Sequence, residues 1–136
     1  MKHYKYFSTT ADMGMEVSGK DISEIFINSA KGMFNLFSAS KNFKPKEEYM
    51  VRLKGESWEE LLFKWLNELL FYYDAYKIYF VDFQILRIEP YRIEAIIRGD
   101  KIENQKIERE IKAVTYHNLE IMKKNSKWEA KVLFDL

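Results

Sequence analysis

The segment from Ser57 to Tyr73 constrains the fold more than any other part of the sequence, because it has the strongest helical pattern. Ser57 and Glu60 have the spacing of a capping box at a helix N-terminus. Apolar residues then recur at helical spacing, at Leu61, Leu62, Trp65, Leu66, Leu69, Leu70 and Tyr73. Such a wide apolar face is typical of a helix packed on a sheet. We therefore predict a helix from Ser57 to about Asp74.

A second helix is predicted over residues 22–37. Asp21 and Glu24 have the spacing of another capping box. One apolar stripe follows at helical spacing, at Ile22, Ile25, Phe26, Ala30, Met33 and Phe37. This stripe predicts that the helix buries a single face against the same core.

The remaining apolar segments have the alternation or the β-rich composition of strands. They cover residues 3–8, 13–17, 49–53, 78–88, 91–97, 113–122 and 128–134. Arg98-Gly99-Asp100 is predicted to end the fifth strand, residues 101–110 to form a solvated loop or short helix, and Lys123-Lys124-Asn125-Ser126 to form the last turn. The prediction is one α+β domain over residues 1–136, with a mixed, mostly antiparallel sheet of about six to seven strands and two α-helices packed on it.

Composition excludes several classes of function. The chain has no cysteine, which excludes disulfides, thiolate metal sites and cysteine nucleophiles. A net charge of +1 provides no global field to attract nucleic acid or a membrane surface. Neither a signal peptide nor an apolar run of membrane-spanning length is recognisable, so we expect a cytoplasmic protein. Phosphate-binding loops, dinucleotide-binding glycine motifs and HExxH are also missing from the sequence.

Two aspartates near the ends of the chain are candidate cation ligands. Asp12 lies between two predicted strands, and Asp135 precedes the last residue, Leu136. If the last strand lies beside the first strands, the two carboxylates could meet, and a cation or a proton would relieve their repulsion. Leu136 would add a terminal carboxylate, and such an oxygen-only set suits Ca²⁺ first and Mg²⁺ second. In the alternative interpretation, Asp12 caps a turn and Asp135 is a frayed end.

His117 and the pair Asn67 and Glu68 are weaker candidates for function. Strand alternation would place His117 and Thr115 on one face, where the histidine could act as a general acid or base. No nucleophile motif accompanies it, so a hydrogen-bonded structural histidine or a contact surface is favoured. Asn67 and Glu68 interrupt the apolar face of the second helix, and a position on the helix surface is the simplest interpretation.

The sequence resembles the archease family over nearly its whole length. The resemblance rests on Thr10-Ala11-Asp12-Met13-Gly14, on Asp21 to Glu24, and on Trp65-Leu66-Asn67-Glu68-Leu69-Leu70. Its most specific part is Lys112-Ala113-Val114-Thr115-Tyr116-His117-Asn118-Leu119-Glu120-Ile121, followed by Phe134-Asp135-Leu136. Two family histidines have no counterpart: Thr9 stands where the family commonly has one, and residues 101–110 contain none.

The resemblance implies an accessory protein rather than an enzyme. Archeases promote guanylylation and multiple turnover of the GTP-dependent tRNA-splicing RNA ligase, and they were also described as modulators of a tRNA cytosine methyltransferase. The family binds Ca²⁺ through positions that correspond here to Asp12, Asp135 and Leu136. The expected partner is therefore the ligase, alternatively the methyltransferase, without strong direct binding of nucleic acid or membrane.

Two other functions compete with this expectation. His117, Asp12 and Asp135 could form the site of a metal-assisted hydrolase, although only one other histidine is present. A direct RNA-binding module could instead use the basic residues Lys101, Lys106, Arg109 and Lys112.

Overall fold

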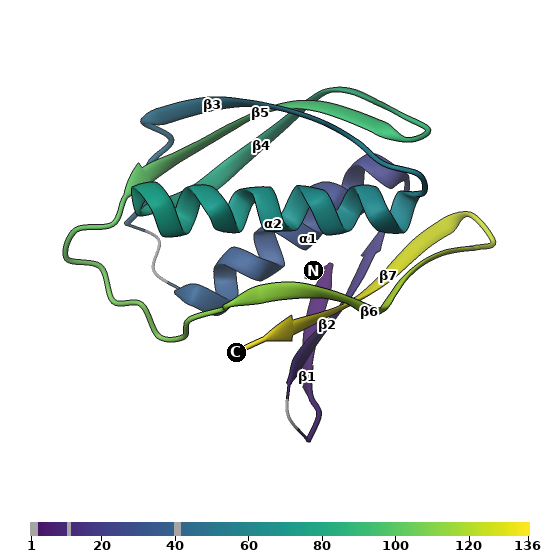
Figure 1. Cartoon of the computed structure of the whole chain (residues 1–136), viewed down its shortest axis with the longest axis horizontal. Coiled ribbons are helices and arrows are strands. Elements are labelled where there is room, and N and C mark those ends of the chain that lie inside the picture. The colour runs from purple at the N-terminus through teal and green to yellow at the C-terminus, as the bar shows by residue number, and fades with distance from the viewer. Residues whose placement is uncertain (1–2, 11, 40–41) are drawn as a thin grey trace.

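The computed structural model describes residues 3–10, 12–39 and 42–136, so that Ala11 of the first loop lies outside the described residues. Two helices and seven strands occur in this part of the chain (Figure 1). Their order is β1 (Tyr4–Ser8), β2 (Met13–Gly19), α1 (Ile22–Phe37), β3 (Glu47–Lys54), α2 (Trp58–Tyr76), β4 (Ile78–Glu89), β5 (Arg92–Lys101), β6 (Ala113–Lys124) and β7 (Lys127–Asp135). The α+β class is thereby confirmed.

The strands form two sheets, whereas the sequence analysis predicted one. A four-stranded sheet has the order β1-β2-β7-β6, a three-stranded sheet has the order β3-β5-β4, and neighbouring strands are antiparallel. Both helices lie between the two sheets (Figure 1). The wide apolar face of α2 explains the division, because α2 contacts β3, β4 and β5 on one side and β6 on the other.

Both predicted capping boxes are present. The carboxylate of Asp21 accepts the N–H of Glu24 at 2.9 Å, and the hydroxyl of Ser57 accepts the N–H of Glu60 at 3.1 Å. Each glutamate in turn accepts a backbone N–H from the residue before the cap, Lys20 or Glu56, at 3.0 Å. Satisfied N–H groups explain why both helices begin where the sequence predicts.

Two boundaries differ from the prediction. Strand β5 continues through Arg98, Gly99 and Asp100 to Lys101 instead of ending at Arg98. Gly99 is needed there because a Cβ at this position would collide with the carbonyl oxygen of Tyr79 on β4. The last turn is tighter than predicted, since β6 and β7 extend to Lys124 and Lys127 and Asn125 has φ 57°. The segment from residue 102 to 112 is an irregular loop with no helix.

The core contains aromatic rings whose hydroxyl groups are buried. Tyr6 donates to the carbonyl of Gly32 at 2.8 Å, and Tyr79 donates to the carbonyl of Ser38 at 2.7 Å. Burial raises the pKa of Tyr6 to about 12 and raises the pKa of Tyr79 further above its ordinary value. Within the described residues, no helix is long and apolar enough to cross a membrane.

These tyrosines predict a loss of stability at alkaline pH. Because the folded-state pKa values are raised, the unfolded chain releases these protons first, and the free energy of unfolding falls as the pH rises above about 10. Urea denaturation at pH 8 and pH 11 measures this fall. Tyr79→Phe should be less stable at pH 8, because it loses a hydrogen bond, but should lose less stability between the two pH values. An equal loss in the variant and the natural chain would contradict the assignment to Tyr79.

Candidate metal centre

The turn between β1 and β2 holds Asp12 through its backbone. The N–H of Thr9 donates to the carbonyl oxygen of Asp12 at 3.0 Å, and the N–H of Asp12 donates to Oγ1 of Thr9 at 2.9 Å. Thr9 therefore closes the turn at the position where the resemblance predicted histidine. In one of the two interpretations above, the carboxylate of Asp12 caps this turn. The hydroxyl of Thr9 caps it instead.

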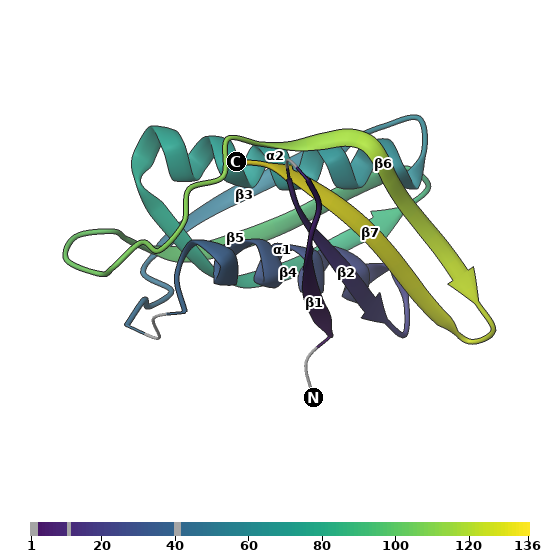
Figure 2. The ribbon, with the colours of Figure 1, turned by 90° about the horizontal axis from the view of Figure 1, so that it is seen from below.

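Pairing of β2 with β7 brings the two ends of the chain together, as the sequence analysis required. Met13 is the register partner of Phe134 in the last pair of the two strands, and Asp12 and Asp135 are the residues that adjoin this pair on either chain segment. The C-terminus and the β1–β2 turn accordingly lie at the same end of the four-stranded sheet (Figure 2).

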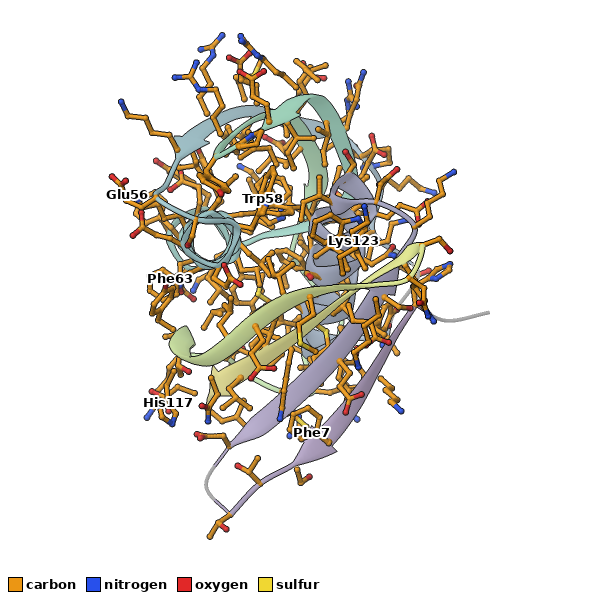
Figure 3. All side chains as sticks on the ribbon, turned by 90° about the vertical axis from the view of Figure 1, so that its right-hand side faces the viewer. Phe7, Glu56, Trp58, Phe63, His117 and Lys123 are labelled. Carbon is orange, nitrogen blue, oxygen red and sulfur yellow. The ribbon has the colours of Figure 1, made fainter. Side chains whose placement is uncertain are left out.

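Strand alternation places both carboxylates on the outer face of this sheet. Met15, Val132 and Phe134 are fully buried against the helices, and Asp135 is exposed. The next outward row consists of Phe7, Gly14 and Leu133, which are register partners across β1, β2 and β7. The ring of Phe7 lies over Gly14 so closely that a Cβ there would collide with it. Figure 3 shows Phe7 beside β1 and β2, on the far side of the four-stranded sheet from α2.

The chemistry of this arrangement fits a hard cation. Among the described residues, no ion pair or side-chain hydrogen bond engages the carboxylate of Asp12 or Asp135. Ca²⁺ takes oxygen ligands such as carboxylates and carbonyls. However, the described residues contain no group of three or more His, Cys, Asp or Glu side chains placed for a metal. A site here would therefore need Leu136, which follows Asp135 and is exposed, as a further oxygen donor.

The backbone of Lys112 and of the first residues of β6 supports Asp135 from the other side. The N–H of Lys112 donates to the carbonyl oxygen of Asp135 at 2.8 Å, and Ala113 is the register partner of Asp135. The side chain of Asn67 on α2 then accepts the N–H of Val114 at 3.1 Å and donates to its carbonyl at 3.2 Å. The sequence predicts Asn67 on the helix surface, whereas its amide binds the backbone of β6. The signal for this contact is an amide within an apolar face, because an amide pairs with backbone as well as with water.

The regular pairing of β6 with β7 stops just before His117. The register of β6 with β7 is interrupted between Thr115 and Glu120, and Asn118 has φ 58°. This bulge leaves His117 exposed, pointing away from the helices (Figure 3). Tyr116 is 52% exposed and meets the ring of Phe63 edge-on, with centroids 5.4 Å apart. His117 forms no metal-ligand cluster with Asp12 and Asp135 in the described part of the chain.

Comparisons with known proteins agree with this architecture. Residues 4–136 match the Archease protein family. The chain belongs to the archease family. A relative named protein archease from Methanosarcina mazei is 36% identical, with 99% of this chain and 97% of the relative covered. Another archease, from Methanothermobacter thermautotrophicus, is 33% identical with full coverage of both chains.

Solved structures show the archease fold as well. The solution structure of protein 1598 from Methanobacterium thermoautotrophicum has a TM-score of 0.88 and 33% identity, with all of both chains covered. A crystal structure from Thermotoga maritima, described as an archease and possible chaperone, has a TM-score of 0.69 over 97% of this chain and 96% of that chain. At 22% identity, the second structure supports the fold alone.

Proposed function

We propose that this chain is an accessory protein, not itself an enzyme, that activates the GTP-dependent tRNA-splicing RNA ligase by direct contact. Membership of the archease family supports the accessory role. The observation that carries the proposal is the register of β2 with β7, which brings Asp12 and Asp135 to the same end of the sheet beside the pair Met13 and Phe134, with both carboxylates free of partners among the described residues. Two such carboxylates provide a focused negative charge that a partner protein could meet.

In this proposal Asp12, Asp135 and Leu136 hold one Ca²⁺, with Mg²⁺ as the second choice. When bound, the ion would supply positive charge that can attract oxygen ligands of a partner. The chain itself contributes the orientation: Thr9 fixes the backbone of Asp12, and Lys112 fixes the backbone of Asp135. Because both anchors are backbone contacts, the carboxylates remain available to the ion.

The position of the site suits contact with a larger protein. Asp12 follows the turn that projects from the four-stranded sheet, and Asp135 lies at the end of β7 (Figure 1). The apolar side chain of Phe7 lies one row away on the same face. A projecting acidic tip with an adjacent aromatic ring can enter a cleft of the ligase.

Calcium binding is the first expected result. Addition of Ca²⁺ should raise the melting temperature, because a ligand at about 100 times its Kd stabilises the folded state by roughly 2.7 kcal/mol. Asp12→Asn and Asp135→Asn should each remove this increase, while the exposed Asp74→Asn on α2 should retain it. Calorimetric titration of the four proteins measures the affinity directly. Unchanged affinity in both variants would contradict the proposed site.

The same variants test the function. With purified ligase and a cleaved tRNA substrate, the natural chain and Asp74→Asn should stimulate multiple turnover, and Asp12→Asn and Asp135→Asn should not. Circular dichroism establishes that each variant is folded. A chain with extra residues after Leu136 tests whether that residue is a ligand, since its affinity for Ca²⁺ should fall. Full stimulation by both aspartate variants would exclude a mechanism that depends on the metal.

A further inference from the structure

The outer face of the three-stranded sheet lies on the opposite side of the helices from the acidic tip (Figure 1). At one end of this face Arg98 of β5 lies between two carboxylates. It donates to Glu48 of β3 at 2.9 Å and to Asp82 of β4 at 2.8 Å. At this end of the face, the positive charge of Arg98 is therefore fully compensated by short ion pairs across all three strands.

The other end of the same face carries more basic than acidic side chains. Two neighbouring rows cross the three strands there, with Arg52, Glu94 and Arg87 in one row and Lys54, Arg92 and Glu89 in the next. Arg87 and Glu89 form an ion pair at 2.8 Å. Among the described residues, no ion pair joins Arg52, Lys54 or Arg92 to a carboxylate, although Glu94 is the register partner of Arg52.

Lys54 and Arg92 are direct register partners on this face, and both side chains are exposed. Like charges at directly opposite positions of an antiparallel pair are destabilising. Arg92 and Arg98 thus lie on the same face of β5 in different electrostatic surroundings. Arg98 pairs with two carboxylates. Arg92 lies between Lys54 and Glu89, and Glu89 is already paired with Arg87. An anion from outside the chain would supply the missing counter-charge.

The surface here is also hollowed. A depression of about 320 Å³ is lined by Arg52, Leu53, Lys54, Arg92, Ile93 and Glu94. Figure 3 shows nitrogen-tipped side chains standing out from this sheet on the side away from the helices. Guanidinium groups bind phosphate through two parallel N–H bonds, and an ammonium group adds a point charge. The depression therefore presents three cationic donors to one hollow of the surface.

We propose that Arg52, Lys54 and Arg92 bind a phosphate group. The ligand chemistry is a phosphate oxyanion, whether it belongs to an RNA strand or to a small phosphorylated compound. The site is independent of the cation at the acidic tip, because the helices separate the two faces. It differs from the basic residues Lys101, Lys106 and Arg109 that the sequence suggested for RNA, since these belong to the end of β5 and the following loop.

The experiment compares two variants with equal loss of charge. Arg52→Ala/Lys54→Ala/Arg92→Ala removes the proposed site, and Lys101→Ala/Lys106→Ala/Arg109→Ala is the matched control. Pyrophosphate and a short single-stranded oligoribonucleotide are titrated while backbone amide signals are followed by NMR. In the natural chain and the control, the signals of residues 52–54 and 92–94 should shift, and in the sheet variant the affinity should fall roughly tenfold or more. Equal losses in both variants, or no shift of these signals with either probe, would overturn the proposal.

The two probes also identify the source of the phosphate. If the site binds RNA, the oligoribonucleotide should bind more tightly than pyrophosphate, and its affinity should fall steeply with salt. If the site binds a small phosphorylated compound, pyrophosphate should bind more tightly than the oligoribonucleotide. Either order supports the site. Thermal unfolding supplies a second measurement: without an anion the sheet variant should be at least as stable as the natural chain, because repulsion between Lys54 and Arg92 is removed. A variant that unfolds at lower temperature would contradict the repulsion.

Discussion

Trp65→Ala is expected to lower the free energy of unfolding by about 4 kcal/mol. Trp65 lies on α2 between the two sheets and is fully buried. Its ring meets Phe26 and Phe83 with centroids 6.3 Å apart, and its indole N–H donates to the carbonyl of Phe26 at 3.0 Å. Alanine would leave a large cavity and would remove the hydrogen bond from the indole to α1, and both losses lower the free energy of unfolding. Urea denaturation at neutral pH measures the effect.

Two further variants separate the contribution of the buried ring from that of the indole hydrogen bond and from that of an exposed ring. Trp65→Phe keeps an aromatic ring but loses the N–H, so it should lose less stability than Trp65→Ala. Phe71→Ala truncates a ring on the same helix that is 55% exposed, and its effect should stay within about 0.5 kcal/mol. If Phe71→Ala and Trp65→Ala destabilised the protein equally, α2 would not lie between the sheets as described.

Asn67→Ala is expected to lower the free energy of unfolding by about 2 to 3 kcal/mol. Strand β6 is an edge strand, and the amide of Asn67 pairs with the N–H and the carbonyl of Val114 as a further strand would. Val114 is 2% exposed, so water cannot replace the amide without rearrangement. Removing the amide leaves a buried donor and a buried acceptor without partners.

The same substitution should weaken Ca²⁺ binding, because Val114 follows Ala113, the register partner of Asp135. Asn67→Asp keeps an acceptor for the N–H of Val114 but turns a carboxylate oxygen toward the carbonyl oxygens of Val114 and Phe63, so it should not restore the stability that Asn67→Ala loses. Calorimetric titration with Ca²⁺ and urea denaturation measure the two quantities separately. Reduced stability with unchanged affinity would show that pairing with β2 alone positions Asp135.

The sequence predicted the local elements well where neighbouring residues decide them. The capping pairs Asp21 with Glu24 and Ser57 with Glu60 satisfy N–H groups within one turn, and so the helix starts were correct. Gly99 misled the prediction of β5, because a glycine that reads as a strand end is required by the carbonyl of Tyr79 on the neighbouring strand. Such a contact connects residues distant in the chain and leaves no local pattern.

For the candidate site, too, the sequence indicated the residue types, and the tertiary structure decided their arrangement. The composition of the ends suggested that Asp12 and Asp135 are cation ligands, and alternation placed Asp135 opposite the buried face of its strand. Whether the two aspartates meet depended on β7 pairing with β2 in one register, since a shift by one residue would turn Asp135 to the other face. The bulge that exposes His117 and the amide bond from Asn67 to Val114 likewise depend on packing against α2 and β7.

The sequence by itself determined the two helices, most of the strands and the residue types that can bind a cation, because these follow from spacing within one segment. Only the tertiary structure decided that the strands form two sheets around the helices, that Thr9 rather than Asp12 closes the first turn, and that Lys54 faces Arg92. The physical reason is that strand pairing and side-chain contacts join residues far apart in the chain, and their energies depend on the whole packed arrangement.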